Sequence, residues 1–106
     1  MPIRNFTRWD KRCPRQKGTL VYVLRLQTGK RYVGSTSNYN ARMTAHFGGY
    51  GAKVTRKYAP MYVERRIPCY NAGYARKVEQ SITKKYIHQY GYSEVRGGCY
   101  TNSKTF

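Results

Sequence analysis

Acidic side chains are scarce in this sequence, and only one of them is well placed to bind a metal ion. The chain has 106 residues, with 4 Asp and Glu against 21 Lys and Arg. Asp10 lies in a basic segment and Glu64 lies beside two arginines, which leaves Glu79 as the best carboxylate ligand. Mg²⁺ is commonly held by one or two carboxylates and keeps several of its waters. The alternative for Glu79 is an ordinary ion pair with Lys77 or Lys84.

Two further residues, four positions apart, have side chains suited to work on a phosphate. Arg42 stays charged and donates two parallel N–H groups to phosphate oxygens, while His46 either relays a proton or binds phosphate. Together with a metal ion, such groups meet the needs of phosphodiester hydrolysis, which are an activated water, neutralised charge on phosphorus and help for the departing oxygen. The alternatives are a solvated helix face for Arg42 and a surface histidine for His46.

The strong positive charge indicates a polyanionic partner. A net charge of +17 causes self-repulsion that binding to a polyanion offsets. Nucleic acid is the favoured partner, ahead of an anionic membrane surface or a ribosome-like structural role. No apolar run of about 18 residues is present, and the N-terminus lacks the apolar stretch of a signal peptide. We therefore expect a soluble intracellular protein, in the cytoplasm or nucleus, with no membrane partner.

The pattern of apolar residues predicts one α+β domain. Alternating and β-branched residues predict strands at 20–24 and 31–34, joined by a glycine turn, and a third strand at 61–63. Helical spacing predicts a helix at 38–47, with Ser37 as its N-cap residue, and another at 72–89, with Asn71 as its N-cap residue. The expected order is β-β-α-β-α, a small three-stranded antiparallel sheet flanked by helices, with a glycine-rich basic loop after the first helix.

The domain is expected to span residues 19–98, preceded by a basic arm at 1–18 and followed by a tail at 99–106. The arm carries many arginines and lysines without helical or strand periodicity. Three cysteines, Cys13, Cys69 and Cys99, have no CxxC spacing, so we interpret them as reduced packing residues rather than zinc ligands.

The ordered motifs over about residues 20–98 resemble the signature of the GIY-YIG nucleases. They are Leu20-Val21-Tyr22, Gly29-Lys30-Arg31-Tyr32-Val33-Gly34-Ser35-Thr36, Arg42 with His46, Gly51-Ala52-Lys53-Val54-Thr55, Glu79 with Ala75, and Val95-Arg96-Gly97-Gly98. Two departures stand out. The sequence has Leu20 and Val21 where the family has Gly and Ile, and Glu94 where many members have Asn.

The resemblance implies a metal-dependent endonuclease that hydrolyses DNA with a single Mg²⁺ or Mn²⁺, in repair, recombination or homing. It implies Glu79 as the metal ligand, and Tyr22 and Tyr32 at the site. A free phenol has a pKa near 10, so a tyrosine base needs a nearby cation. Tyr22 is favoured as the base with Tyr32 as its hydrogen-bonding neighbour, although Tyr32, His46 and a metal-bound hydroxide stay open as alternatives.

The predicted contacts to DNA come from small and basic residues near these motifs. They are Gly34, Ser35, Lys53, Arg56, Lys57 and Arg96. A targeting protein partner and the oligomeric state stay open. The alternative function is a non-catalytic basic nucleic-acid-binding protein, which would grip phosphates and stack bases but would have no need for a carboxylate beside the two tyrosines and the arginine.

Overall fold

A hairpin forms the centre of the molecule, as predicted. The computed structural model describes residues 19–98 and 100. Strand β1 (Thr19–Leu26) pairs antiparallel with β2 (Arg31–Thr36). The connecting 3₁₀ turn η1 (Gln27–Gly29) has positive φ at its last two residues, and the glycine meets that requirement at little cost.

The sheet has four strands, so the prediction of three was wrong. Its order is β3-β1-β2-β4, with β3 (Pro60–Cys69) antiparallel to β1 and β4 (Val95–Gly97) parallel to β2. The parallel strand has only three residues and ends in a glycine. It therefore carries no alternation that a sequence pattern could reveal, and Gly97-Gly98 resembled a loop. The α+β class is correct.

Strand β3 is much longer than the predicted segment 61–63. It lies at the edge of the sheet, and most of its residues are partly or fully exposed. Edge strands tolerate charged residues and proline, because the outer edge of such a strand forms no hydrogen bonds to a neighbouring strand. The sequence pattern did not reveal the full strand, because it contains charged residues and a proline: Glu64, Arg65, Arg66 and Pro68.

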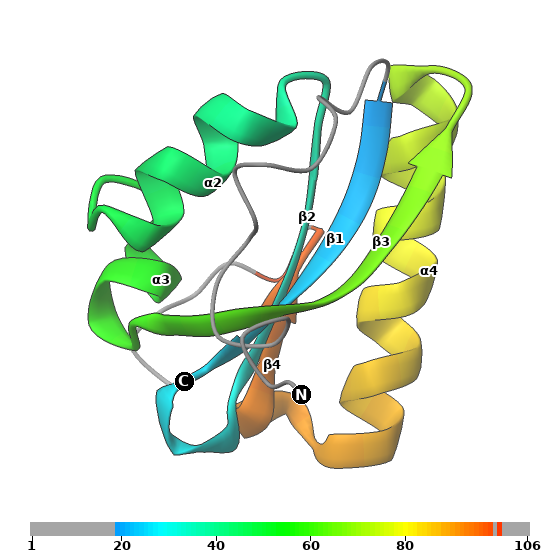
Figure 1. Cartoon of the computed structure of the whole chain (residues 1–106). Coiled ribbons are helices and arrows are strands. Elements are labelled where there is room, and N and C mark those ends of the chain that lie inside the picture. Colours follow the sequence, from blue (N-terminus) through cyan, green and yellow to red (C-terminus); the bar gives the residue numbers. More distant parts are fainter. Residues whose placement is uncertain (1–18, 99, 101–106) are drawn as a thin grey trace, which may run out of the picture.

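Helices cover both faces of the sheet (Figure 1). α2 (Tyr39–Phe47) and α3 (Lys53–Lys57) lie on one face, and the long α4 (Ala72–Tyr90) lies on the other. Side chains of β1 alternate between two separate cores, so that its even-numbered residues pack toward α2 and its odd-numbered residues toward α4. This explains the uninterrupted apolar run in β1, which is buried on both faces.

The ends of the helices differ from the prediction in detail. Asn38, and not Ser37, is the N-cap residue of α2, because its side chain accepts from the Ala41 N–H at 3.2 Å. Asn71 is the N-cap residue of α4 as predicted, and Gly91, at φ 99°, is its C-cap residue.

Part of the predicted loop is helical, and two of the three cysteines lie outside the described residues. A short helix, α3, occupies part of the segment predicted as a loop. Cys69 is buried with a free thiol, as a packing residue would be, whereas Cys13 and Cys99 lie outside the described residues, as do the predicted arm and nearly all of the tail. Within residues 19–98, no helix has the length and apolar character needed to cross a bilayer.

Candidate active site

Three aromatic rings meet on the face of the sheet that α2 covers. Tyr22 on β1 and Tyr32 on β2 point to the same face, with their ring centroids 6.4 Å apart. The His46 ring of α2 lies edge-on to both, at 5.5 Å from Tyr22 and 5.4 Å from Tyr32. The fold thus brings together the two motif tyrosines and the predicted histidine, which come from β1, β2 and α2.

Gly34 makes this arrangement possible. It lies directly opposite Tyr22 in the β1–β2 ladder. A Cβ atom at Gly34 would be 2.5 Å from the Tyr22 hydroxyl oxygen and 3.0 Å from the Tyr32 ring. The Tyr22 ring therefore packs directly over Gly34, and any side chain at position 34 would displace the ring. The sequence had suggested a contact between Gly34 and DNA, and in the structure its neighbours are the two tyrosines.

A chain of hydrogen bonds leads away from the Tyr22 hydroxyl. Tyr22 Oη lies 2.7 Å from His46 Nε2, and His46 Nδ1 lies 3.0 Å from Thr55 Oγ1. The Thr55 hydroxyl donates its one proton to the Ala52 carbonyl at 2.9 Å, so it must accept from Nδ1–H of His46. Nε2 of a neutral His46 is then an acceptor, and Tyr22 donates to it.

The sequence did not predict the part played by Thr55. This residue lies within the glycine-rich motif that contributes to the family resemblance, but nothing in the sequence pairs it with a histidine on another helix. His46 itself is fully buried, rather than a surface histidine.

Burial and one guanidinium set the protonation states of this cluster. Burial, together with a smaller effect of the nearby Arg42, lowers the pKa of His46 to about 4, so His46 is neutral near pH 7 and can accept a proton. Burial raises the pKa of both Tyr22 and Tyr32, and Arg42 opposes this rise in each. Both phenols are therefore protonated until more positive charge comes near.

Arg42 keeps its charge beside the two phenols. Burial alone would lower the pKa of this guanidinium, but its interactions with Tyr22 and Tyr32 outweigh burial and raise the pKa overall. Arg42 thus lies within the cluster and not on a solvated helix face, and it supplies a fixed positive charge next to the phenols.

Glu79 approaches the same region from α4 and is held by neutral donors. Its Oε1 accepts from the Ser35 hydroxyl at 2.7 Å, and its Oε2 accepts from the Gly98 N–H at 2.9 Å. Among the described residues no lysine or arginine is paired with it, so neither Lys77 nor Lys84 forms the alternative ion pair there. The carboxylate is close enough to raise the pKa of both tyrosines.

These surroundings fit a cation. Each Glu79 oxygen makes one hydrogen bond and has a further lone pair to offer. A cavity of about 260 Å³ adjoins the carboxylate, lined by Arg76, Glu79, Gln80 and Gly98. No group of three or more His, Cys, Asp or Glu side chains gathers anywhere in residues 19–98. An ion here would have one protein carboxylate and would keep most of its waters, as Mg²⁺ does.

The predicted DNA contacts are placed in different ways. Lys53, Arg56 and Lys57 are exposed on α3, and Lys53 lines a cavity of about 300 Å³ together with Tyr32, Ala52 and Val54. Ser35 instead orients Glu79.

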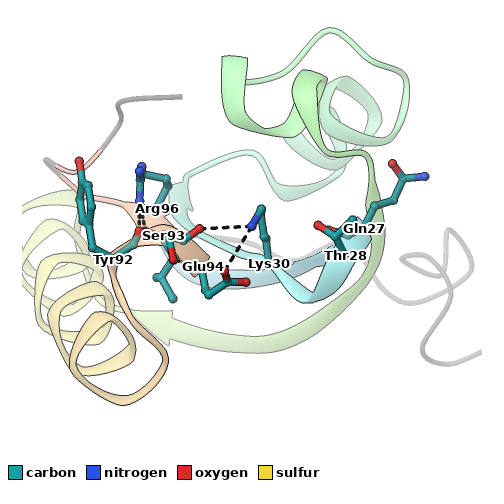
Figure 2. Close-up of polar contacts among 8 residues, drawn as sticks. Gln27, Thr28, Lys30, Tyr92, Ser93, Glu94 and Arg96 are labelled. Atoms are coloured by element: carbon teal, nitrogen blue, oxygen red, sulfur yellow. Dashed lines mark hydrogen bonds and ion pairs between the residues drawn. The ribbon is translucent and has the colours of Figure 1, made fainter. Parts of the chain in front are cut away.

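Arg96 and Glu94 help to pack β4, in which Arg96 is the neighbour of Tyr32 across the β2–β4 pairing. The Arg96 side chain is buried, with its guanidinium 3.8 Å from the centre of the Tyr92 ring and a hydrogen bond to the Val95 carbonyl at 2.9 Å (Figure 2). Glu94, which stands where many GIY-YIG sequences have Asn, pairs with Lys30 at 3.4 Å. This pair links the start of β2 to the 3₁₀ turn η2 (Tyr92–Glu94) that precedes β4. The departure at Glu94 is therefore structural.

Comparison with known proteins agrees with the geometry. The chain is 38% identical over 65 residues to a UPF0213 protein of Nitratidesulfovibrio vulgaris (strain Hildenborough), covering 61% of this chain and 59% of that protein. It is 35% identical over 66 residues to a "UPF0213 protein in VLF1-GP41 intergenic region" of Autographa californica nuclear polyhedrosis virus, covering 61% of this chain and 64% of that protein. The chain thus matches about six tenths of the length of these curated relatives.

No solved structure matches the chain significantly. Residues 19–94, by contrast, match the family described as the GIY-YIG catalytic domain, and this range includes the tyrosine pair, Arg42, His46 and Glu79. The chain therefore belongs to the GIY-YIG catalytic domain family, whose members are generally nucleases.

Proposed function

We propose that this protein is a metal-dependent endonuclease that hydrolyses DNA phosphodiester bonds with a single Mg²⁺ or Mn²⁺. The observation that carries the proposal is Glu79. In a chain of charge +17, this carboxylate has no cationic partner among the described residues, and two neutral donors hold it beside both motif tyrosines. A protein that only gripped phosphates would gain nothing from a negative charge in that place.

The relay from Tyr22 supports the choice of this phenol as the base. Tyr22 passes its proton to His46 Nε2, while its oxygen accepts a proton from the attacking water. Thr55 keeps Nδ1 of His46 in the protonated form that the transfer requires. A divalent cation on Glu79 would polarise the phosphate and lower the pKa of the nearby phenols.

Arg42 has the complementary role toward the phosphate. Its guanidinium is charged, lies within reach of the phenols and offers parallel N–H donors to the oxygens of the phosphorus. Charge that develops on these oxygens during attack is then neutralised by a group that is already in place. Repair, recombination and homing are the proposed settings, with DNA as the substrate.

The test is nicking of supercoiled plasmid by the purified full chain. We expect nicking with Mg²⁺ or Mn²⁺, none after EDTA, and none with Glu79→Gln, which keeps the shape of the side chain but loses its charge. Glu94→Gln is the matched control and should cut normally, because Glu94 pairs with Lys30 and not with the site. Nicking that survives EDTA, or an active Glu79→Gln protein, would contradict the metal role. Binding without any nicking would favour the non-catalytic alternative.

A further inference from the structure

A cavity lies along the exposed side of α4, on the opposite face of the sheet from α2. Its volume is about 870 Å³. The lining residues are aromatic, basic or small and polar: Tyr70, Asn71, Gly73, Tyr74, Arg76, Lys77, Gln80, Ser81 and Lys84. We call this cavity the α4 groove. No acidic side chain lines it, and none of the roles described above uses its tyrosines.

Two stacked tyrosines form one end of the α4 groove. The rings of Tyr70 and Tyr74 lie 4.8 Å apart and are inclined by only 25°. Tyr70 is 80% exposed and Tyr74 is 43% exposed, so this aromatic pair faces solvent rather than the core. A flat, solvent-facing ring binds another flat ring, and every nucleic-acid base has such a face.

The remainder of the groove is suited to a phosphate backbone. Arg76, Gln80 and Lys84 are spaced four residues apart along α4, and Gly73 and Lys77 form the adjacent row. These rows lie away from the helix face that packs on the sheet, so the charges are exposed. Gly73 contributes no side chain to the groove beside the tyrosines, and a Cβ there would meet Asn71 Oδ1 at 3.4 Å.

The α4 groove leads to Glu79. The smaller cavity beside the carboxylate shares Arg76 and Gln80 with the groove. A strand lying along the basic rows would therefore enter the cavity that contains Glu79. In the interior of a duplex the faces of the bases are covered by their neighbours, so away from a duplex end only an unpaired base can stack on Tyr70.

We propose that the α4 groove binds an unpaired segment of DNA that adjoins the bond to be cut. The proposal rests on the endonuclease function and specifies its substrate as a junction between duplex and single strand, such as a flap or a splayed end. Bases would stack on Tyr70 and Tyr74, and the phosphates of the same segment would contact Arg76, Lys77 and Lys84.

The test compares binding of two DNAs by the full chain in EDTA, where no cutting occurs. One is a fluorescent duplex and the other is the same duplex with a single-stranded thymidine tail. We expect tighter binding of the tailed DNA. Tyr70→Ala and Tyr74→Ala should each weaken binding of the tail roughly 5- to 100-fold while leaving duplex binding unchanged. Tyr70→Phe should bind normally, because it keeps the ring.

The control is Tyr50→Ala, which removes a tyrosine that is 84% exposed and lies outside the groove. It should not change binding of the tail. The dependence on salt separates stacking from charge. The Tyr→Ala variants should keep the slope of log K against log salt, whereas Lys77→Gln with Lys84→Gln should flatten it by about one to two. Equal losses on both DNAs, no loss on the tail, or stronger binding of an RNA tail would overturn the proposal.

A cleavage assay on the tailed duplex separates this proposal from the endonuclease function. Tyrosine-dependent binding of the tail without any Mg²⁺-dependent cutting would leave the groove standing and overturn the nuclease. Mg²⁺-dependent cutting at wild-type rates in the Tyr70→Ala, Tyr74→Ala double variant would leave the nuclease standing and overturn the groove.

Discussion

Several neighbouring groups shift the pKa of the Tyr22 hydroxyl in opposite directions. Burial and the neighbouring Tyr32 raise the pKa, whereas Arg42 lowers it. The acceptor that would take its proton, His46, has a pKa of about 4. The transfer is therefore unfavourable in the free protein. In the proposed mechanism, a cation bound at Glu79 would lower the pKa of the phenol, so the phenol would stay protonated until the metal ion is bound.

The roles of the two phenols can be separated by removing one hydroxyl at a time. Tyr22→Phe should lose most of the cleavage activity together with the rise in rate at alkaline pH, because the titrating oxygen is gone. Tyr32→Phe should lose less activity and keep the rise. The measurement is single-turnover cleavage from neutral to alkaline pH in Mg²⁺, with melting temperatures as a check on packing. If Tyr32→Phe is the inactive variant, the phenol that lines the cavity with Lys53 is the base.

Burial of neutral His46 should also appear in the stability of the protein. The pKa of His46 is lowered from 6.5 to about 4 in the folded state, so the unfolded chain takes up a proton that the folded chain refuses. This stability is present above pH 6.5 and is lost as the pH falls toward 4, by about 3 kcal/mol in total. Urea unfolding near pH 7 and near pH 4 measures it.

The variant His46→Gln should lose that part of the pH dependence, since glutamine accepts a hydrogen bond but does not titrate. His88→Gln is the control, because His88 is exposed at the end of α4 and should leave the pH dependence unchanged. An unchanged pH dependence in His46→Gln would mean that the histidine is not held neutral.

At the scale of the elements, the end of β4 is linked by a hydrogen bond to Glu79, the proposed metal ligand. Gly98, directly after β4, donates its N–H to Glu79 with φ at 53°, and its missing Cβ would lie 2.3 Å from Gln80 Oε1. Gly98→Ala should cost about 1–2 kcal/mol of stability from the left-handed backbone. It should also raise the Mg²⁺ concentration needed for cleavage roughly tenfold or more, because it disturbs a group that orients the ligand.

Gly91→Ala separates these two effects. Gly91 also has positive φ, at 99°, but no atom lies within 4 Å of the position of an added Cβ. This variant should lose a similar amount of stability and keep the normal Mg²⁺ requirement. Titration of Mg²⁺ in the nicking assay, alongside thermal unfolding, compares the two. A normal Mg²⁺ requirement in Gly98→Ala would show that the hydrogen bond does not position Glu79.

The elements also show where prediction from the sequence succeeds and where it stops. The hairpin and the helices α2 and α4 were predicted because each has enough residues for its apolar period to show. Strand β4 was missed because three residues have no period, and its pairing with β2 depends on the crossover through α4. At the site, the motif residues were found by resemblance. Thr55 and Gly98 lie within these motifs, but their hydrogen bonds to His46 and Glu79 were not predicted, because a hydrogen bond across the fold leaves no local pattern.

At the scale of the whole molecule, charge governs the approach to DNA. A net charge of +17 predicts binding to duplex that weakens steeply with salt. Engagement of about 5 phosphates gives a slope of log K against log salt of roughly −4 to −5. Residues 1–18 contain six of the 21 basic side chains, and their deletion should flatten the slope without changing the need for metal. Titrations at several salt concentrations test this, and an unchanged slope would mean that this segment does not touch DNA.

The bond between Gly98 and Glu79 has a consequence for how the protein is made. The donor comes 19 residues after the carboxylate in the sequence. It follows the end of α4 and strand β4. A nascent chain that has left the ribosome only as far as α4 already contains both tyrosines, the arginine and Glu79, but lacks the Gly98 N–H that holds the Glu79 carboxylate. Because domains assemble as units during synthesis, the site becomes complete only when the final strand docks. The proposed hydrolytic activity is then withheld throughout translation and begins with the closing of the sheet.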